Sequence, residues 1–217
     1  RPARLDSSST QEDADQAAAD LWVADALGLS NSEAVTLSQV SPILAADPRL
    51  LRGEALWHLG RKEESKSELE WLRRDTSTDL RAQYQLAIFF RDLGLYRSSI
   101  LAANAAIMLS PAHSPFDAPS FLIRLAYPAY YQDLVLAESV ANDLDPLLVF
   151  SLIRQESLFE GFATSFAYAH GLMQIIPSTG QSIARSLSWP SFDTPDLYRP
   201  YISVKFGTWY LARQLDT

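Results

Sequence analysis

The stretch DPLLVFSLIRQES, residues 145–157, ends with a carboxylate where its pattern calls for a hydrocarbon. Asp145 suits a helix cap, a proline fits the first helical position, and the remaining residues are compatible with a helix. At about 100° per residue, Glu156 falls on the same arc as Val149 and Leu152. We therefore predict a helix that carries Glu156 on its apolar face. A carboxylate in such surroundings is paired, protonated or used in chemistry.

A second stretch, HGLMQIIPSTG at residues 170–180, has the residue types of a ligand site. Gly171 permits a ligand to approach the backbone closely, and Met173 offers an adaptable apolar surface. Gln174 offers both a donor and an acceptor for a polar ligand such as a sugar. Taken alone, the stretch is explained as well by plain packing and a turn.

The overall composition is that of an ordinary globular protein that binds no nucleic acid. The chain has 217 residues, of which 47% are hydrophobic and 20% charged, enough for one large domain or two small ones. Its net charge of −8 argues against a polyanionic partner. The absence of cysteine excludes disulfides and thiolate metal sites. No apolar run approaches the roughly 20 residues of a transmembrane helix, and we find no signal sequence.

Two fifteen-residue stretches in the first half of the chain repeat each other. ALWHLGRKEESKSEL (residues 55–69) aligns with FFRDLGLYRSSILAA (residues 89–103) at an offset of 34 residues, which places Gly60 over Gly94 and Ser65 over Ser99. This offset is the period of tetratricopeptide helix pairs, in which glycine allows the turn and a small residue permits close helix contact. We predict helical repeats here, with a generic helical bundle as the alternative.

Helix signals dominate the chain and no segment alternates like a strand, so we predict an all-α fold. Three-to-four-residue apolar spacing marks helices at residues 21–27, 50–59, 63–72, 80–93 and 97–109. Three prolines within residues 109–120 interrupt any helix, and we expect helix to resume from about Pro128. We therefore place a helical-repeat domain at residues 1–120 and a second domain at residues 121–217.

Together, the two stretches resemble the catalytic domain of soluble lytic transglycosylases, which has a goose-type lysozyme-like fold. YPAYY (residues 127–131) and DLYRPYISVKFGTWYLARQL (residues 196–215) also look like that family's helices before and after the motifs. The resemblance covers about residues 121–217. The repeat half resembles, less closely, the helical superhelix that often precedes this domain.

The resemblance implies cleavage of the β-1,4 bond between N-acetylmuramic acid and N-acetylglucosamine in peptidoglycan, without net addition of water. Glu156 would be the catalytic carboxylate: it protonates the leaving oxygen, then accepts the proton of the muramoyl C6 hydroxyl, which closes onto C1 as a 1,6-anhydro product. These successive roles call for a carboxyl whose pKa is raised by an apolar pocket. With no second carboxylate, the substrate's own N-acetyl group would assist.

The same resemblance implies that Ser157 supports the glutamate or its helix, that the bound sugar contacts Ser165 and Gln174, and that Met173 lines the groove. The full set of substrate-binding residues that we expect is Ser157, Ser165, Gly171, Met173 and Gln174.

Three departures from the family pattern stand out. Tyr168 occupies a loop position where glycine is usual, so we expect that loop to sit differently, and Gly180 stands where alanine is common. The family's downstream Ala-Tyr-Asn-Ala-Gly segment does not occur before Thr217. We therefore expect the second domain to be C-terminally incomplete.

Several other residues have plainer explanations. We expect Glu160 to be solvated beyond the end of the helix, and residues 61–70 to be a solvated charged helix face. The three histidines, His58, His113 and His170, lack metal-ligand spacing, and we predict no metal and no cofactor. Most of the tryptophans and tyrosines should be core, with Tyr168 the best candidate to stack on a sugar.

The leading hypothesis from the sequence is thus an exported peptidoglycan lytic transglycosylase of the periplasm or cell envelope. Its partners would be glycan strands, with a protein partner for the repeats and no nucleic acid. One alternative is a non-catalytic peptidoglycan-binding scaffold. Another is a hydrolytic lysozyme, in which water rather than the C6 hydroxyl attacks.

Overall fold

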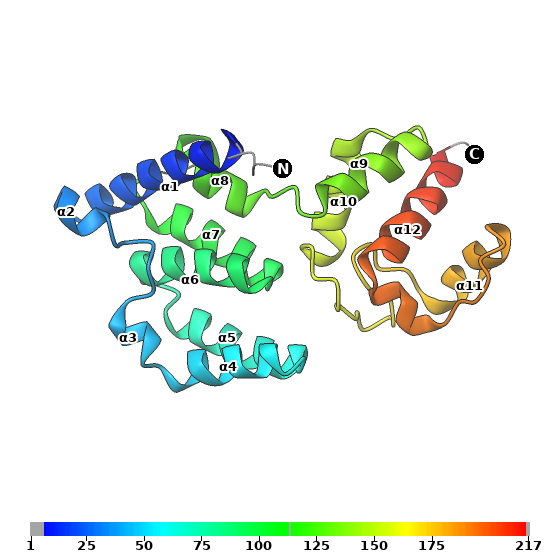
Figure 1. Cartoon of the computed structure of the whole chain (residues 1–217), viewed down its shortest axis with the longest axis horizontal. Helices are drawn as coiled ribbons and strands as arrows, with labels where there is room; N and C mark the ends of the chain where they lie inside the picture. Colours follow the sequence, from blue (N-terminus) through cyan, green and yellow to red (C-terminus); the bar gives the residue numbers. More distant parts are fainter. Residues whose placement is uncertain (1–6, 113, 216–217) are drawn as a thin grey trace, which may run out of the picture. The chain divides into compact units, whose positions relative to one another are not determined.

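The regular secondary structure of the described residues is helical (Figure 1). The computed structural model describes residues 7–112 and 114–215, so His113 lies outside it, and β-type pairing in these ranges is limited to two isolated bridges within residues 164–175. The all-α prediction is therefore confirmed. None of the described helices combines the length and the apolar character that crossing a membrane requires.

The helical elements fall in two series along the chain. The first series contains α1 (Ser7–Ala26), α2 (Asn31–Ala34), α3 (Pro42–Ala45), α4 (Pro48–His58), α5 (Lys62–Asp75), α6 (Leu80–Leu93), α7 (Tyr96–Leu109), the 3-10 helix η1 (Pro115–Asp117) and α8 (Ser120–Ala126). The second series contains α9 (Gln132–Ala141), α10 (Pro146–Ser157), α11 (Pro177–Ser186), the 3-10 helix η2 (Thr194–Tyr198) and α12 (Pro200–Leu215). The helices predicted at residues 63–72, 80–93 and 97–109 lie within α5, α6 and α7, and those predicted at 21–27 and 50–59 run one residue past the ends of α1 and α4.

The chain separates into two compact units between Pro128 and Ala129. The sequence places a boundary earlier, at residue 120, and expects helix to resume at about Pro128. The difference comes from α8, which starts at Ser120, packs on α1 and α7, and carries Arg124, 2.6 Å from the carboxylate of Asp15 on α1. The helix therefore resumes before Pro128 and stays with the repeats. The assignment of a separate role to each segment remains a prediction.

Aspartates cap three helices that matter for the argument. Asp47, Asp79 and Asp145 precede α4, α6 and α10, and each accepts a hydrogen bond from a backbone N–H of the first turn, at 2.8, 3.0 and 2.9 Å. A proline follows Asp47 and Asp145 at the first helical position. These caps satisfy N–H groups that lack a partner within the helix, so the helix starts can be read from the sequence.

Equivalent buried hydrogen bonds join the helices of the two repeats. Ser65 on α5 donates its hydroxyl to the carbonyl of Gly53 on α4, and Ser99 on α7 donates to the carbonyl of Ala87 on α6. Both distances are 2.7 Å, and both serines are fully buried. Each pair of residues is related to the other by the 34-residue offset. Small residues at these positions let the helices of each pair pack closely side by side (Figure 1).

The same offset relates the turns inside the two helix pairs. Gly60 follows α4 with φ +76° and Gly94 follows α6 with φ +86°, in the left-handed region that favours glycine. The N–H of the residue after each glycine returns to its helix, to the carbonyl of Leu56 at 2.9 Å and to that of Phe90 at 2.8 Å. The two helix pairs therefore share turns as well as contacts, and the predicted helical repeat is confirmed.

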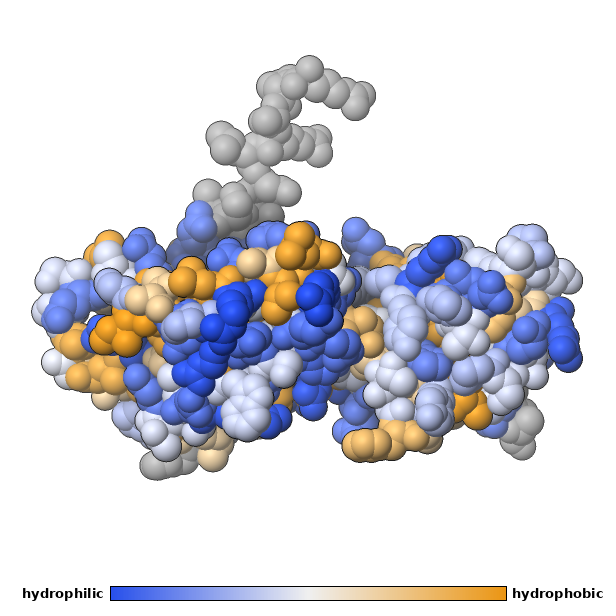
Figure 2. Space-filling view, turned by 90° about the horizontal axis from the view of Figure 1, so that it is seen from below, coloured by the Kyte–Doolittle hydropathy of each residue, from blue (hydrophilic) through white to orange (hydrophobic). Residues whose placement is uncertain are grey.

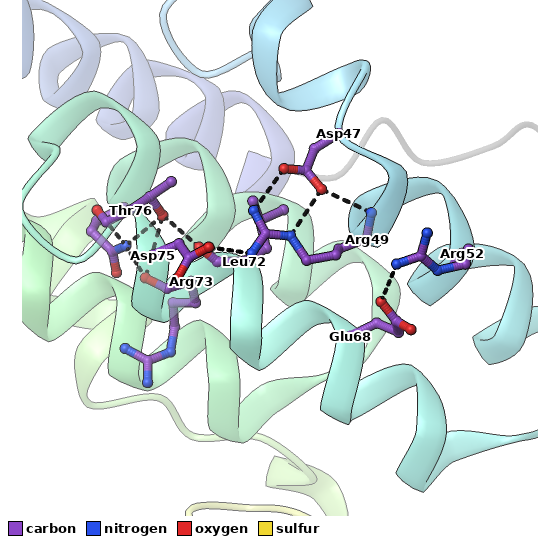
Figure 3. Close-up of polar contacts among 9 residues, drawn as sticks. Asp47, Arg49, Arg52, Glu68, Leu72, Arg73, Asp75 and Thr76 are labelled. Atoms are coloured by element: carbon purple, nitrogen blue, oxygen red, sulfur yellow. Dashed lines mark hydrogen bonds and ion pairs between the residues drawn. The ribbon is translucent and has the colours of Figure 1, made fainter.

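Ion pairs also link α4 to α5 (Figure 3). Arg49 contacts the carboxylates of Asp47 and Asp75, and Arg52 lies 2.8 Å from Glu68. The side chains of these pairs are 20–58% exposed, and solvent-accessible pairs stabilise a fold by only about 0–1 kcal/mol each. The buried serine contacts are therefore the better determinants of helix pairing.

The charged run at residues 61–70 is solvated only in part. Its first four residues are exposed, but Glu70 is 7% exposed, and Arg73 donates to its carboxylate at 2.8 Å. The prediction of a wholly solvated face is therefore wrong at its last residue, because the helix turns Glu70 inward where Arg73 can pair with it. Elsewhere on this unit, hydrophilic residues are interleaved with hydrophobic ones (Figure 2).

Removal of either repeat serine hydroxyl should weaken the fold by a similar amount. We expect Ser65→Ala and Ser99→Ala each to lower the free energy of unfolding by about 0.5–1.5 kcal/mol, the usual net value of one hydrogen bond. Urea denaturation followed by circular dichroism measures the change. Ser67→Ala, on the exposed face of α5, is the matched control and should have little effect. Equal stability of all three variants would contradict the role of these contacts.

A buried carboxylate makes the stability of the first unit depend on pH. Asp20 on α1 accepts hydrogen bonds from the hydroxyls of Tyr84 at 2.7 Å and Ser38 at 3.2 Å. Burial raises the pKa of Asp20 above its ordinary value, although the hydrogen bonds from Tyr84 and Ser38 oppose the shift. Its protonated form therefore stabilises the folded chain below the unfolded pKa of about 3.9, and this contribution is lost as the pH rises through the folded pKa.

Asp20→Asn should remove this dependence, because an amide does not titrate. We expect the free energy of unfolding of the native chain to fall relative to that of Asp20→Asn as the pH rises from about 4 toward 7. Urea titrations of both chains at several pH values give the difference. A difference that is constant or grows with pH would contradict the assignment.

Candidate functional site

Glu156 stands on the last turn of α10 with its side chain exposed. The residues that α10 buries are Val149, Ile153 and Ser157, spaced four apart. This stripe is centred on Ile153, and Glu156, three positions later, points about 60° to one side of it. The helix prediction is confirmed, but the prediction of apolar surroundings for Glu156 is wrong, because Glu156 lies at the edge of the buried stripe and its side chain is exposed.

Ser157 ties the end of α10 to the stretch at residues 170–176. Its hydroxyl oxygen lies 2.9 Å from the carbonyl oxygen of Leu172 and 3.1 Å from that of Ile153. The residue is 6% exposed, and its single proton is shared between these two acceptors. Ser157 is thus placed to hold the helix against the loop, and its contact with a sugar stays a prediction.

The backbone after Ser157 is held in an unusual conformation. Leu158 and Phe159 both have positive φ, +50° and +61°, which costs a non-glycine residue about 1–2 kcal/mol. Phe159 is 1% exposed, and its ring meets those of Tyr130 and Phe150 with centroids 5.7 and 6.5 Å away. Burial of the phenylalanine offsets the strain. The end of α10, next to Glu156, is therefore fixed by packing.

Residues 163–175 form a loop closed by its own hydrogen bonds. The N–H of Gly171 donates to the carbonyl of Ala163, and that of His170 to the carbonyl of Ile175, both at 3.0 Å. Within this loop the hydroxyl of Ser165 accepts from the N–H of Ala169 at 3.1 Å. Ser165 therefore holds the turn at residues 165–169, and a role in sugar binding stays a prediction.

The backbone of Tyr168 adopts a left-handed conformation. Its φ is +57°, in the left-handed region that glycine adopts without strain, and its N–H donates to the carbonyl of Ser165 at 3.0 Å. The turn is thus closed with tyrosine in place of glycine. The side chain is 73% exposed and lies outside the groove described below.

Two glycines allow the loop to press against η2 and α12. A Cβ atom on Gly171, whose φ is +75°, would lie 2.0 Å from the carbonyl oxygen of Leu197. One on Gly207 would lie 2.3 Å from the sulfur of Met173. The N–H of Met173 donates to the hydroxyl of Ser203 on α12 at 3.2 Å. Gly171 is therefore required by the packing of the loop, and neither Gly207 nor Ser203 stood out in the sequence.

A groove of about 270 Å³ opens beside α10, and we call it the α12 groove. Its lining residues come from α10, the loop, α11 and α12: Leu152, Met173, Gln174, Ile175, Ile176, Thr179, Gly207, Tyr210, Leu211 and Gln214. Leu152 precedes Glu156 by one helical turn, so the carboxylate is a surface neighbour of this lining. Of the predicted substrate residues, the groove brings together Met173 and Gln174.

The side chain of Gln174 forms hydrogen bonds within its own loop. Its side-chain amide donates to the carbonyl of Gly171 at 2.8 Å and approaches that of Ala163 at 3.3 Å. Its φ of +47° is another left-handed value. The amide oxygen takes no part in these two bonds, and as an acceptor it can bind a hydroxyl donor of a polar ligand in the groove.

Three side chains behind the loop form a hydrogen-bonded cluster. The hydroxyl of Tyr198 on η2 lies 2.8 Å from Nδ1 of His170 and 2.6 Å from the hydroxyl of Thr164. His170 is 7% exposed, so its ring is buried within this cluster. This cluster joins η2 to both ends of the loop. His58, by contrast, is on the surface of α4.

Glu160 is not solvated. It is 4% exposed, so the expectation of a solvated carboxylate is wrong. The left-handed residues at 158 and 159 turn the chain back on itself, and Glu160 enters the interior instead of continuing away from the helix. Glu156 is thus the exposed carboxylate of this segment.

Gly171→Ala should destabilise the second unit strongly. The new methyl group adds a left-handed penalty to a clash with backbone, together roughly 2–5 kcal/mol of unfolding free energy. Chemical denaturation measures the loss. Gly161→Ala is the matched control in the same unit, because its nearest neighbour, the hydroxyl of Tyr131, would lie 3.7 Å from the Cβ. Similar losses in both variants would contradict the close approach at Gly171.

Comparison with known proteins finds one family over the second unit. Residues 133–217 match the model of the transglycosylase SLT domain. Over 84 residues the chain is 37% identical to a membrane-bound lytic murein transglycosylase C of Actinobacillus pleuropneumoniae, covering 38% of this chain and 23% of that protein. Over 177 residues it is 25% identical to the soluble lytic murein transglycosylase of Salmonella typhimurium, covering 80% of this chain and 25% of that protein. The chain thus spans about a quarter of these relatives.

Solved structures give the same fold. The 70 kDa soluble lytic transglycosylase of Escherichia coli aligns with a TM-score of 0.65 at 22% identity, over 88% of this chain and 29% of that one. The lytic transglycosylase Slt of Pseudomonas aeruginosa aligns with a TM-score of 0.62 at 22% identity, over 89% of this chain and 30% of that one.

Proposed function

We propose that this chain, which belongs to the lytic transglycosylase family through the SLT domain of residues 133–217, cleaves the glycan strands of peptidoglycan. The bond cut is the β-1,4 bond between N-acetylmuramic acid and N-acetylglucosamine, and the product is a 1,6-anhydromuramoyl end. The observation that carries the proposal is the position of Glu156, an exposed carboxylate one turn from the lining of the α12 groove.

Glu156 acts first as an acid and then as a base. Its protonated carboxyl gives a proton to the glycosidic oxygen, and the bond from C1 to that oxygen breaks. The carboxylate then takes the proton of the muramoyl C6 hydroxyl, whose oxygen bonds to C1. Glu156 ends protonated, as it began, and no water is consumed. One carboxyl suffices for both transfers because they occur in sequence.

The exposure of Glu156 is compatible with these roles. A glycan laid along the α12 groove would cover the last turn of α10 and exclude water from the carboxyl, which protects a reactive intermediate from hydrolysis. The burial of Glu160 supports a scheme with one carboxylate, since a buried side chain cannot activate water in the groove. A hydrolytic lysozyme is therefore the weaker candidate.

The other predicted residues take supporting roles in this proposal. Met173 lines the groove with an adaptable apolar surface, and the amide oxygen of Gln174 accepts a hydrogen bond from the sugar. Ser157 positions α10 through its contact with Leu172, and Gly171 allows the loop to lie where these groups meet the groove. Ser165 holds the adjoining turn.

The substrate places the protein in the cell envelope, where peptidoglycan lies. The names of the relatives, one membrane-bound and one soluble, support an envelope location and leave the mode of attachment open. The repeat segment of residues 1–120 would then serve as an arm for the SLT domain, and its helix pairs offer a surface to a protein partner.

The first test is mass spectrometry of the products released from purified peptidoglycan. We expect anhydromuramoyl ends from the native chain and a loss of about 10²–10⁴-fold in Glu156→Gln, the usual contribution of acid–base catalysis. Asp133→Asn, which removes an exposed carboxylate from α9 of the same unit, is the matched control and should retain activity. Circular dichroism checks that both variants fold.

Other products would contradict the proposal. Reducing muramoyl ends would identify a hydrolytic lysozyme. Equal activity of Glu156→Gln and the native chain would remove Glu156 from the chemistry. A folded native chain that releases nothing would contradict cleavage by these 217 residues and favour the scaffold.

A further inference from the structure

We propose that a second hollow of the SLT unit binds a neutral saccharide ring, apart from the α12 groove. This hollow, which we call the aromatic hollow, measures about 590 Å³ and is lined by Trp189, Phe192, Asp193, Asp196 and Arg199, among others. Its size lies within the range of about 300–1,000 Å³ that small-molecule sites occupy. The proposal goes beyond bond cleavage and does not require Glu156.

The aromatic side of the hollow is held in place by buried neighbours. Trp189 meets the ring of Phe206 edge-on with centroids 5.4 Å apart, and Phe192 meets the same ring at 5.5 Å. Phe206 itself is fully buried. A Cβ atom on Gly180 of α11 would lie 2.8 Å from Phe192, so this glycine lets the ring settle against the helix. Fixed rings bind a sugar face with little loss of conformational entropy.

The polar side of the hollow offers donors and acceptors, two of which, Asp196 and Arg199, form an ion pair. Nη1 of Arg199 lies 3.3 Å from Oδ1 of Asp196, and Oδ2 of Asp196 accepts from the N–H of Asp193 at 3.0 Å. The backbone N–H of Asp196 in turn donates to the backbone carbonyl of Asp193 at 2.9 Å. The guanidinium is 73% exposed, so several of its N–H groups face solvent.

This combination selects a neutral ligand rich in hydroxyl groups. A free anion would meet two carboxylates and one guanidinium, and a free cation would have to displace Arg199 from Asp196 before both carboxylates could bind it. Hydroxyl groups can donate to the remaining carboxylate lone pairs and accept from the guanidinium without breaking the ion pair. A pyranose also presents an apolar C–H face that packs on an aromatic ring. The chemistry points to a saccharide.

The aromatic hollow and the α12 groove share no lining residue. Ile202, on the first turn of α12, lines the hollow, and Tyr210, about 12 Å farther along the helix axis, lines the groove. On α11, Thr179 lines the groove, whereas the next residue, Gly180, faces Phe192. Two saccharide sites on one unit would hold a polymeric glycan more tightly than either site alone.

The test is a titration of the Glu156→Gln chain with tetra-N-acetylchitotetraose, a neutral β-1,4-linked oligosaccharide, followed by ¹H–¹⁵N NMR. The chain has five tryptophans, each with one indole N–H signal. We expect the Trp189 signal to move in a saturable way, and that of Trp209, which lines neither site, to stay in place. Use of Glu156→Gln excludes turnover of the probe.

Arg199→Ala should weaken the binding reported by Trp189 about tenfold, the effect of losing one or two hydrogen bonds to a charged group. Arg185→Ala, which removes an exposed arginine of α11 outside both sites, is the matched control and should leave the affinity unchanged. The spectrum of each variant reports whether it is folded.

Three results would overturn the proposal. In the first, the Trp189 signal does not move at about 10 mM probe. In the second, the chain with Arg199→Ala binds the probe as tightly as the chain that keeps Arg199. In the third, Trp189 responds to a lysine-containing dipeptide but not to the saccharide. The peptidoglycan assay is independent of these results. A chain that cleaves but gives no Trp189 response loses only this inference, and a chain that binds but does not cleave loses only the proposed activity.

Discussion

The close passage of the Gly171–Gln174 backbone between η2 and α12 is the constraint on which the candidate site depends. No side chain fits at Gly171 or Gly207, and this lack of bulk lets Met173 donate to Ser203 and face the groove. The same passage presents the carbonyl of Leu172 to Ser157 on α10. Gly171 and Gly207 thus allow the loop to take this position, and the hydroxyl of Ser157 ties the end of α10 to the loop. Glu156, on the last turn of α10, is thereby held at the edge of the groove.

Backbone strain gathers around this passage. Leu158, Phe159, Tyr168 and Gln174 all have positive φ, although none is glycine. Such conformations persist where tertiary packing determines them, and they cluster at functional sites. Phe159 is fixed by a buried aromatic contact, and Tyr168 by the closed turn at Ser165. The strain at each position is therefore balanced by a contact, and the loop has a defined shape before any glycan binds.

The repeat unit is organised differently, by contacts that are close in sequence. Ser65 and Ser99 each bond to a carbonyl twelve residues earlier, and each helix pair turns at a left-handed glycine. Local contacts of this kind can form within one helix pair, and stacking of pairs then builds the core. For this reason the repeat could be predicted from two aligned stretches, whereas the boundary near Pro128 depended on the packing of α8 against α1 and α7.

The sequence by itself determined the all-α fold, the cap of α10, the 34-residue repeat and the pair of motifs that carry Glu156 and Gln174. These features arise from residues close along the chain, whose hydrogen bonds and apolar periodicity depend little on distant neighbours. Tertiary structure alone decided that Glu156 is exposed and Glu160 buried, and that the hydroxyl of Ser157 bonds to the loop carbonyl of Leu172. Helical periodicity gives the direction of a side chain relative to its own helix axis. Which of those directions becomes interior depends on the elements packed against the helix, and for α10 these include α9 and the loop at residues 170–176.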